Sequence, residues 1–146
     1  MKVEKIRFIE PGERPYHWTL LNHFVYDRYI RTPSVGLNLL ATAVKGEFKD
    51  TLMYSEAISK IPWKDVEDAD VVFIGIFTFQ AKRGYQIARY IKAHTRAVVV
   101  MGGLHASMNY QEAVNYCDYV LLGEGEESIL ELLHGLREGL PLNFPG

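Results

Sequence analysis

The sequence predicts an α/β domain with a doubly wound parallel sheet, because short apolar runs alternate with helical patterns along most of the chain. Two of these runs end abruptly in glycine. Val98–Met101 is followed by Gly102 and Gly103, and Tyr119–Leu122 is followed by Gly123-Glu124-Gly125. Apolar runs this short, rich in β-branched residues, are typical of buried parallel strands. Glycine just past such a strand lets the backbone turn sharply and lets a ligand approach it closely.

Five strands and four helices are predicted in alternation. The predicted strands are Lys5–Ile9, Phe48–Tyr54, Val71–Phe79, Val98–Met101 and Asp118–Leu122. The predicted helices are Gly36–Val44, Ala81–His94, Tyr110–Tyr116 and Glu126–Arg137. Strand–helix alternation at this spacing favours right-handed βαβ units, and five strands favour the flavodoxin-like order 2-1-3-4-5 with helices on both faces.

Local signals support several of these boundaries. Thr32-Pro33-Ser34 is typical of a helix start, and Gly46 is a plausible stop for the same helix. The polar start of the second strand indicates a sheet edge. Pro62 interrupts Ser55–Asp68, which stays unassigned. The ring-rich segment Glu13–Pro33 has no clean period, and its Trp18–Arg31 part has room for a helical turn or two.

Composition narrows the function. The chain has 146 residues, a net charge of −2 and one cysteine, Cys117. This length fits one domain, and the charge gives no basic footprint for nucleic acid. A single cysteine excludes an intrachain disulfide or a multi-cysteine metal site in this chain, and it fits a reducing cytoplasm. The amino terminus matches neither a signal peptide nor a membrane span. We expect a domain over residues 1–139, with 140–146 beginning a linker to a further domain.

The two glycine-tipped strands predict a ligand crevice, since open α/β sheets bind ligands at the carboxyl ends of their strands. Gly123-Glu124-Gly125 is similar to a dinucleotide fingerprint, but it follows the fifth strand and has Ser128 in the third glycine position. Three nearby glutamates also disfavour a pyrophosphate; a simple helix-start turn is the alternative. The crevice therefore suits a neutral ligand rich in amides better than a bare phosphate.

Gly102–Ser107 is the better candidate contact loop. Within it, His105 is either a ligand or acid–base group, or it fixes the shape of the loop. His17 and His23 lie in the ring-rich segment without an acidic or thiol partner at ligand spacing, so no metal site is assigned. The surrounding rings line an apolar pocket or form a satellite core or domain interface. No nucleophile with its base is recognisable, and no catalytic residue is assigned.

The motifs, taken together, resemble the amino-terminal cobalamin-binding domain of cobalamin-dependent radical SAM proteins. The family motif GG-x-H-x-[ST] is matched by Gly102, Gly103, His105 and Ser107. The family run V-D-Y-V-V-x-G-E-G-E is matched by Cys117–Glu126, P-x-x-G-L by Pro33–Leu37, and A-D-V-V-G-I-S by Ala69–Phe77. The match covers roughly three-quarters of the chain in order.

The resemblance implies a cobalamin whose nucleotide tail enters the crevice while the corrin caps the strand ends and faces a separate radical SAM domain. The cofactor-binding residues implied are Thr78, Gln80, Gly102, Gly103, His105, Ser107, Gly123, Glu124 and Gly125. S-adenosylmethionine and an iron–sulfur cluster are expected only in a C-terminal radical SAM domain of the same chain, where methyl transfer or rearrangement would take place. The chain alone is not expected to be catalytic.

Two positions depart from the family pattern. The D-x-H-x-x-G motif that supplies an axial histidine is not matched by Glu13–Trp18, so we expect no protein histidine on cobalt. Phe77 replaces a small hydroxyl residue in the loop after the third strand. A degenerate domain that serves as an interaction or substrate-docking module without cofactor is therefore the alternative. A third possibility is that the chain binds another flat cofactor, such as a flavin. This possibility is the least favoured, because the sequence contains no phosphate-binding loop.

Overall fold

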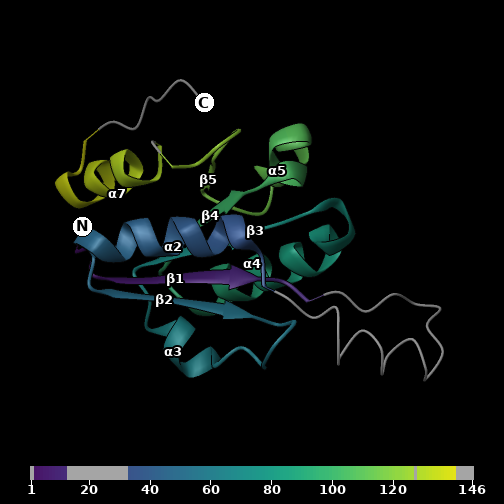
Figure 1. The fold of residues 1–146 in the computed structure, drawn as a ribbon, viewed down its shortest axis with the longest axis horizontal. Coiled ribbons are helices and arrows are strands. Elements are labelled where there is room, and N and C mark those ends of the chain that lie inside the picture. The colour runs from purple at the N-terminus through teal and green to yellow at the C-terminus, as the bar shows by residue number, and fades with distance from the viewer. Residues whose placement is uncertain (1, 13–32, 127, 141–146) are drawn as a thin grey trace.

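The computed structural model describes residues 2–12, 33–126 and 128–140, and they form a sheet of five parallel strands (Figure 1). The strands are β1 (Lys5–Glu10), β2 (Asp50–Ser55), β3 (Val71–Gly75), β4 (Val98–Gly102) and β5 (Tyr119–Val120). Their order is β2-β1-β3-β4-β5, and every neighbouring pair is parallel. The predicted fold class is confirmed, as is the position of the second strand at a sheet edge.

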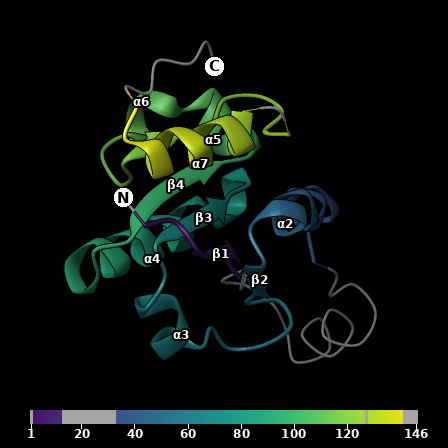
Figure 2. The ribbon, with the colours of Figure 1, turned by 90° about the vertical axis from the view of Figure 1, so that its left-hand side faces the viewer.

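Helices cover both faces of the sheet (Figure 2). One face is packed by α2 (Val35–Glu47) and α7 (Ser128–Glu138), and the other by α3 (Trp63–Glu67), α4 (Ala81–His94), α5 (Leu104–Met108) and α6 (Tyr110–Ala113). Side chains alternate between the two cores, so Phe8 of β1 faces α2 while Ile9 faces α4. Among the described helices, none is long and apolar enough to cross a membrane.

Local sequence explains the best-predicted helices. Ser34 caps α2 through its Oγ, which accepts a hydrogen bond from the Leu37 N–H at 3.4 Å. The predicted bounds of α4 are those observed, and its predicted stripe, Tyr85, Ala88 and Ile91, is buried. The proposed stop at Gly46 is wrong, because α2 continues through it to Glu47.

The predicted third strand was too long. It ends at Gly75 instead of Phe79, and a 3₁₀ turn, η2 (Thr78–Gln80), follows. The Gln80 side chain stabilises this turn, because its Oε1 accepts from the Phe77 N–H at 3.1 Å and its Nε2 donates to the Pro11 carbonyl at 2.9 Å. A prediction based only on runs of apolar residues does not detect side-chain hydrogen bonds of this kind.

Other boundaries differ as well. The second strand begins at Asp50 rather than Phe48, and the fifth covers only Tyr119–Val120. The unassigned segment contains α3, which starts directly after Pro62. The predicted loop after β4 contains α5, and the predicted Tyr110–Tyr116 helix is helical only to Ala113. The segment Trp18–Arg31 lies outside the described residues.

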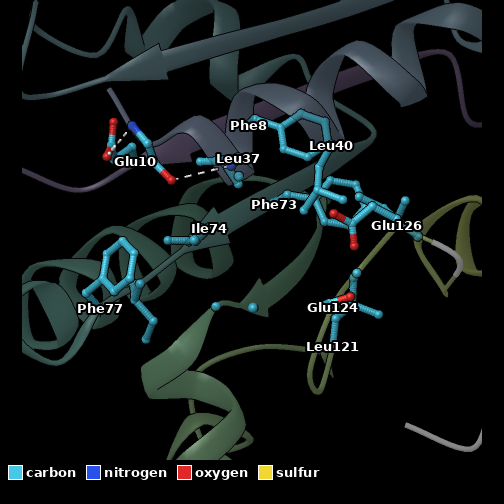
Figure 3. Close-up of a pocket in the computed structure, with 18 of the residues that line it drawn as sticks. Phe8, Glu10, Leu37, Leu40, Phe73, Ile74, Phe77, Leu121, Glu124 and Glu126 are labelled. Atoms are coloured by element: carbon cyan, nitrogen blue, oxygen red, sulfur yellow. Dashed lines mark hydrogen bonds between the residues drawn. The ribbon is translucent and has the colours of Figure 1, made fainter. Parts of the chain in front are cut away.

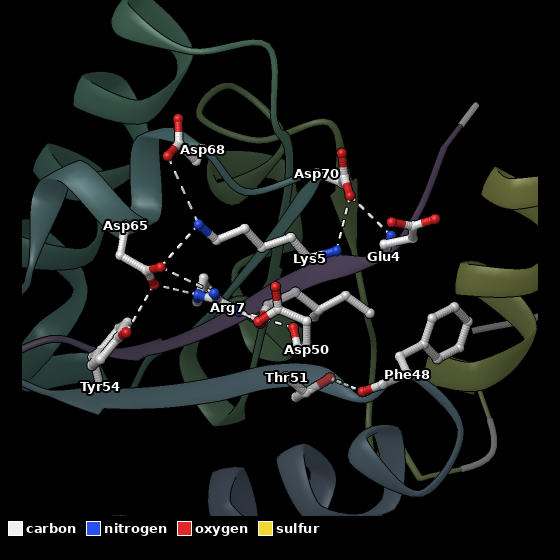
Figure 4. A network of polar contacts seen from close by, with 11 residues as sticks. Glu4, Lys5, Arg7, Phe48, Asp50, Thr51, Tyr54, Asp65, Asp68 and Asp70 are labelled. Carbon is white, nitrogen blue, oxygen red and sulfur yellow. Dashed lines mark hydrogen bonds and ion pairs between the residues drawn. The ribbon is translucent and has the colours of Figure 1, made fainter.

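A buried arginine network ties β1 to β2 and α3 (Figure 4). Arg7 is 2% exposed, and its guanidinium forms an ion pair with both carboxylate oxygens of Asp65 and donates to the Asp50 carbonyl at 2.8 Å. Asp65 also accepts from the Tyr54 hydroxyl at 2.8 Å and pairs with Lys5 at 2.9 Å. Hydrogen bonding from Arg7, aided by Lys5 and Tyr54, holds the pKa of the Asp65 carboxyl well below its usual range.

This network predicts an acid-sensitive contribution to stability. Because the folded pKa of Asp65 is depressed, its contribution is present above the unfolded pKa of about 3.9 and is lost as the pH falls through the folded pKa. We expect Asp65→Asn to lower the free energy of unfolding at pH 7 by about 3 kcal/mol, since Arg7 stays buried with one anion fewer. Urea unfolding at pH 7, 5, 3 and 2 measures the effect.

The matched control is Asp68→Asn. Asp68 is 73% exposed and lies 3.9 Å from Lys5, so its loss is expected to cost less than about 1 kcal/mol. Asp65→Asn must also flatten the loss of stability between pH 5 and 2. If Asp65→Asn loses stability with falling pH as steeply as the unmodified chain does, another carboxylate governs the acid dependence of stability.

Candidate functional site

A cavity of about 310 Å³ lies at the carboxyl ends of the strands, on the face covered by α2 and α7 (Figure 3). Its wall combines the ends of β1, β3 and β4 with the start of α2 and the connection from β5 to α7. The residues that line it are Phe8, Glu10, Ser34, Gly36, Leu37, Leu40, Phe73, Ile74, Gly75, Ile76, Phe77, Gln80, Gly102, Gly103, Leu121, Gly123, Glu124, Gly125, Glu126 and Ile129. The cavity lies at the predicted edge of the sheet.

Its interior is apolar. Phe8 and Phe73 stack with ring centroids 4.8 Å apart and are almost completely buried, and Leu40 and Ile129 contribute from the two covering helices. A flat apolar group that enters this space gains hydrophobic and dispersion contacts without displacing a polar partner. The interior therefore favours an aromatic or otherwise apolar part of a ligand.

Glycines keep the rim open, and Gly103 is the most constrained of them. Its φ is +92°, and a Cβ at this position would lie 2.9 Å from the Ile76 carbonyl oxygen. The loops on either side of it are joined by the backbone, because the Ile76 N–H donates to the Gly102 carbonyl at 3.0 Å and the His105 N–H donates to the Ile76 carbonyl at 3.2 Å. Only glycine allows the β3 and β4 loops to approach this closely.

Charge in the wall is entirely negative among its described residues. Glu10, Glu124 and Glu126 line the cavity, while no lysine or arginine of the described segments does. Figure 3 shows Glu10 on one side of the cavity and the other two carboxylates on the opposite side. The described part of the wall offers carboxylates and no cationic side chain, so it disfavours a buried free phosphate.

Six of the nine predicted site residues line the cavity. They are Gln80, Gly102, Gly103, Gly123, Glu124 and Gly125. The Ser107 hydroxyl lies beside it and accepts a hydrogen bond from the Gly123 N–H at 2.9 Å. This bond ties the two glycine loops together, so Ser107 shapes the rim.

His105 and Thr78 lie behind the rim. His105 is 8% exposed, with Nδ1 3.3 Å from the Thr78 hydroxyl and Nε2 3.2 Å from the Tyr85 hydroxyl. Burial and the nearby Glu112 carboxylate raise the pKa of Tyr85 to about 12, so its hydroxyl is protonated at neutral pH. These contacts favour the interpretation in which His105 fixes the shape of its loop.

Sequence reasoning missed the contribution of α2 and β1. Leu37 and Leu40 project from α2 into the cavity, and Glu10 ends β1 beside them. The motif Pro33–Leu37 marked the start of this helix but did not indicate that it walls the site. A signal for Glu10 was present, since a carboxylate directly after a buried strand is expected at the ligand edge.

Phe77 lines the cavity without filling it. The residue is 41% exposed, and its ring stacks on that of Phe79, with centroids 5.7 Å apart. The replacement of a small hydroxyl residue by Phe77 therefore leaves the cavity open, because Phe77 lies in the wall beside a space of about 310 Å³. Together, the cavity suits a ligand with an apolar end, hydrogen-bonding groups near the rim and no buried net negative charge.

Comparison with known families agrees with this geometry. The model of the B12 binding domain matches residues 27–133. Bacteriochlorophyllide d C-12(1)-methyltransferase of Chlorobaculum tepidum is 36% identical over 108 residues, which are 73% of this chain and 23% of that protein. Bacteriochlorophyllide d C-8(2)-methyltransferase of the same organism is 38% identical over 66 residues, which are 45% of this chain and 14% of that protein. The chain thus spans at most about a quarter of the length of these relatives.

Two solved structures share the fold. The cobalamin-dependent S-adenosylmethionine radical enzyme OxsB, with aqua-cobalamin bound, superposes with a TM-score of 0.73 at 14% identity over 97% of this chain and 20% of its own. The radical S-adenosylmethionine methyltransferase TsrM from Kitasatospora setae, with tryptophan and a SAM analogue bound, gives a TM-score of 0.70 at 18% identity over 94% of this chain and 26% of its own.

Because the β3 and β4 loops lie so close together, we expect alanine substitution to destabilise the fold much more at Gly103 than at the adjacent Gly102. Gly103→Ala places a methyl group against the Ile76 carbonyl in a backbone conformation that alanine avoids. We expect it to lower the free energy of unfolding by about 2 kcal/mol. Gly102→Ala is the control, because its nearest contacts, at 3.7 Å, are ordinary. Thermal unfolding of the two variants measures the difference, and equal melting temperatures would contradict the proposed constraint.

Proposed function

Because the chain belongs to the B12-binding domain family, we propose that it binds cobalamin in the cavity at its strand ends, as the cofactor domain of a larger radical SAM enzyme. The observation that carries this proposal is the preformed cavity, apolar inside and open at a glycine rim. In the proposed arrangement the nucleotide tail enters the cavity. The corrin lies over the rim formed by Gly102, Gly103 and Gly123.

The chemistry of the wall fits the parts of the cofactor. The aromatic base of the tail suits the apolar interior beside Phe8 and Phe73. The phosphodiester of the tail carries a charge that the acidic wall disfavours, so it belongs at the solvent-facing rim. The positively charged cobalt centre of the corrin offsets that charge. Carboxamides around the corrin can donate to Glu124 and to exposed backbone carbonyls of the loops.

The chain's own residues have positioning roles in this proposal. Gln80 holds the β3 loop against Pro11, and Ser107 joins the two glycine loops. His105 and Thr78 support the rim from behind. When bound, cobalamin supplies a cobalt centre that can carry a methyl group.

No protein histidine is proposed as a ligand of cobalt. Of the three described histidines, His94 and His134 bond to groups away from the cavity, and His105 is buried under the rim. None of the three lines the cavity. His17 and His23 lie outside the described residues, and their surroundings do not match D-x-H-x-x-G.

Catalysis is proposed to need a further domain. The relatives and solved structures that match are several times longer than this chain, and their names describe methyltransferases or S-adenosylmethionine radical enzymes. We therefore place S-adenosylmethionine and an iron–sulfur cluster in a C-terminal domain of the full-length protein. Methyl transfer is the reaction class that the relatives favour over rearrangement.

Direct binding tests the proposal. We expect hydroxocobalamin to remain on the desalted chain, with corrin absorbance close to one equivalent. Gly102→Val is expected to abolish binding while leaving the circular dichroism spectrum unchanged, because a Cβ there meets Leu121 at an ordinary distance of 3.7 Å and the added methyl groups occupy the rim. Gly46→Ala is the control, since a Cβ there meets nothing within 4 Å and the residue does not line the cavity. A chain that retains no corrin absorbance would refute the proposal.

An interaction or substrate-docking module is the second candidate function. Large apolar side chains are exposed at the same edge of the fold: Phe77, Phe79, Leu104 and Met108. A corrin or a following domain would cover such a surface, and so would a partner of a domain without cofactor.

The two candidates differ in what this surface binds. If the chain is the cofactor domain, Phe79→Ser is expected to weaken association with the downstream domain while cobalamin stays bound, because Phe79 does not line the cavity. Pull-down with the downstream domain and corrin absorbance are measured on the same variant. Association that survives without any corrin absorbance in the unmodified chain would favour the docking module.

A further inference from the structure

We propose that Glu10 accepts a hydrogen bond from a ribose hydroxyl of the nucleotide tail and so makes the cavity selective for corrinoids that carry a complete tail. This inference rests on the proposed function. Glu10 is the last residue of β1 and lines the cavity beside Leu37 (Figure 3). It lies outside the motifs that indicated the site.

Only one of the two carboxylate oxygens of Glu10 has a hydrogen-bond donor among the described residues. Glu10 is only 5% exposed, and its Oε1 accepts a hydrogen bond from the Ser34 N–H at 2.9 Å. Its Oε2 is buried without a hydrogen-bond partner among the described residues. Ser55 pairs with Glu10 in the β1–β2 register, and its buried hydroxyl also has no partner among them. Two unpaired oxygens therefore lie at neighbouring strand ends.

Such a carboxylate is costly in the absence of a donor. Burying a polar group without a hydrogen bond destabilises a fold, and a charged group does so more than a neutral one. Among the described residues, no lysine or arginine lines the cavity to compensate Glu10. A donor supplied by the ligand would recover this cost and give an affinity that depends on the donor.

The chemistry of the tail identifies the donor. The ionised phosphodiester has no hydrogen to donate and is repelled by a carboxylate. The dimethylbenzimidazole base has no N–H or O–H, and it suits the apolar interior beside Phe8. Phe8 lies two residues before Glu10 on the same face of β1, deeper in the sheet. Ribose hydroxyls, which lie between the base and the phosphate, are the donors that fit the level of Glu10.

Equilibrium titrations compare three corrinoids: hydroxocobalamin, cobinamide, which lacks the phosphate, the ribose and the base, and the cobamide whose lower base is adenine. They are performed on the unmodified chain and on Glu10→Gln. The amide oxygen of this variant can still accept from the Ser34 N–H, but an amide N–H₂ takes the place of Oε2. We expect the affinity for hydroxocobalamin and for the adenine cobamide to fall by about tenfold or more in this variant, while cobinamide binding is unchanged.

Glu124→Gln is the matched control, because it removes the same charge from the opposite side of the same cavity. It is expected to weaken the complete corrinoids less than Glu10→Gln does. Thermal unfolding without ligand checks the fold, and Glu10→Gln is expected to melt no lower than the unmodified chain, since a buried amide costs less than a carboxylate. Glu10→Asp, which keeps the charge but shortens the reach, is the second variant and is expected to show the same selective loss.

The outcomes separate the two proposals. If the unmodified chain binds none of the three corrinoids, the proposed function fails. If it binds them and neither Glu10 variant changes the affinities, or if cobinamide weakens equally, the role of Glu10 is refuted. A loss confined to the adenine cobamide would assign the contact to the base amine and overturn the ribose assignment.

Discussion

The site depends on the backbone contact between the loops that leave β3 and β4. Ile76 donates to Gly102 and accepts from His105, and Gly103 between them has a φ of +92° with no room for a side chain. This contact ends β3 early, turns the chain into α5 and sets the rim of the cavity. The Ser107 bond to Gly123 then joins the β5 loop to the same unit. Because most of these bonds involve backbone groups, the rim is preformed before any ligand arrives.

Two regions of the molecule differ in how their buried charges are compensated. On the α3 side, Arg7 is buried with Asp65 and Asp50 around it, so its charge is compensated within the fold. On the α2 side, the cavity carries Glu10 and other carboxylates, and the described part of its wall contains no lysine or arginine. The first arrangement stabilises the β1–β2–α3 unit. The second leaves carboxylates at the carboxyl ends of the strands without a cationic partner among the described lining residues.

Much of the fold could be predicted because it follows from local patterns. Apolar runs located all five strands, the bounds of α4 were predicted to the residue, and the three residues predicted for its apolar stripe are buried. The site was predictable only where glycine marks it. Leu37 and Leu40 reach the cavity through helix packing, which brings distant segments together without a signature in the sequence, whereas the position of Glu10 directly after a buried strand did indicate the strand-end edge. The shortened β3 and the unforeseen α5 have the same origin, since side-chain and backbone bonds between loops override a local preference.

We propose that the cavity holds the nucleotide tail away from cobalt and that no histidine of the chain binds cobalt in place of the tail base. Electron paramagnetic resonance of the chain with cob(II)alamin tests both parts at once. Nitrogen bound to Co(II) splits each cobalt line into three, whether it comes from the cofactor's own base or from a histidine. We expect bound cob(II)alamin whose cobalt lines lack this splitting. A bound spectrum with the triplet splitting would contradict this expectation, because either the tail base or a protein nitrogen would then occupy the axial position.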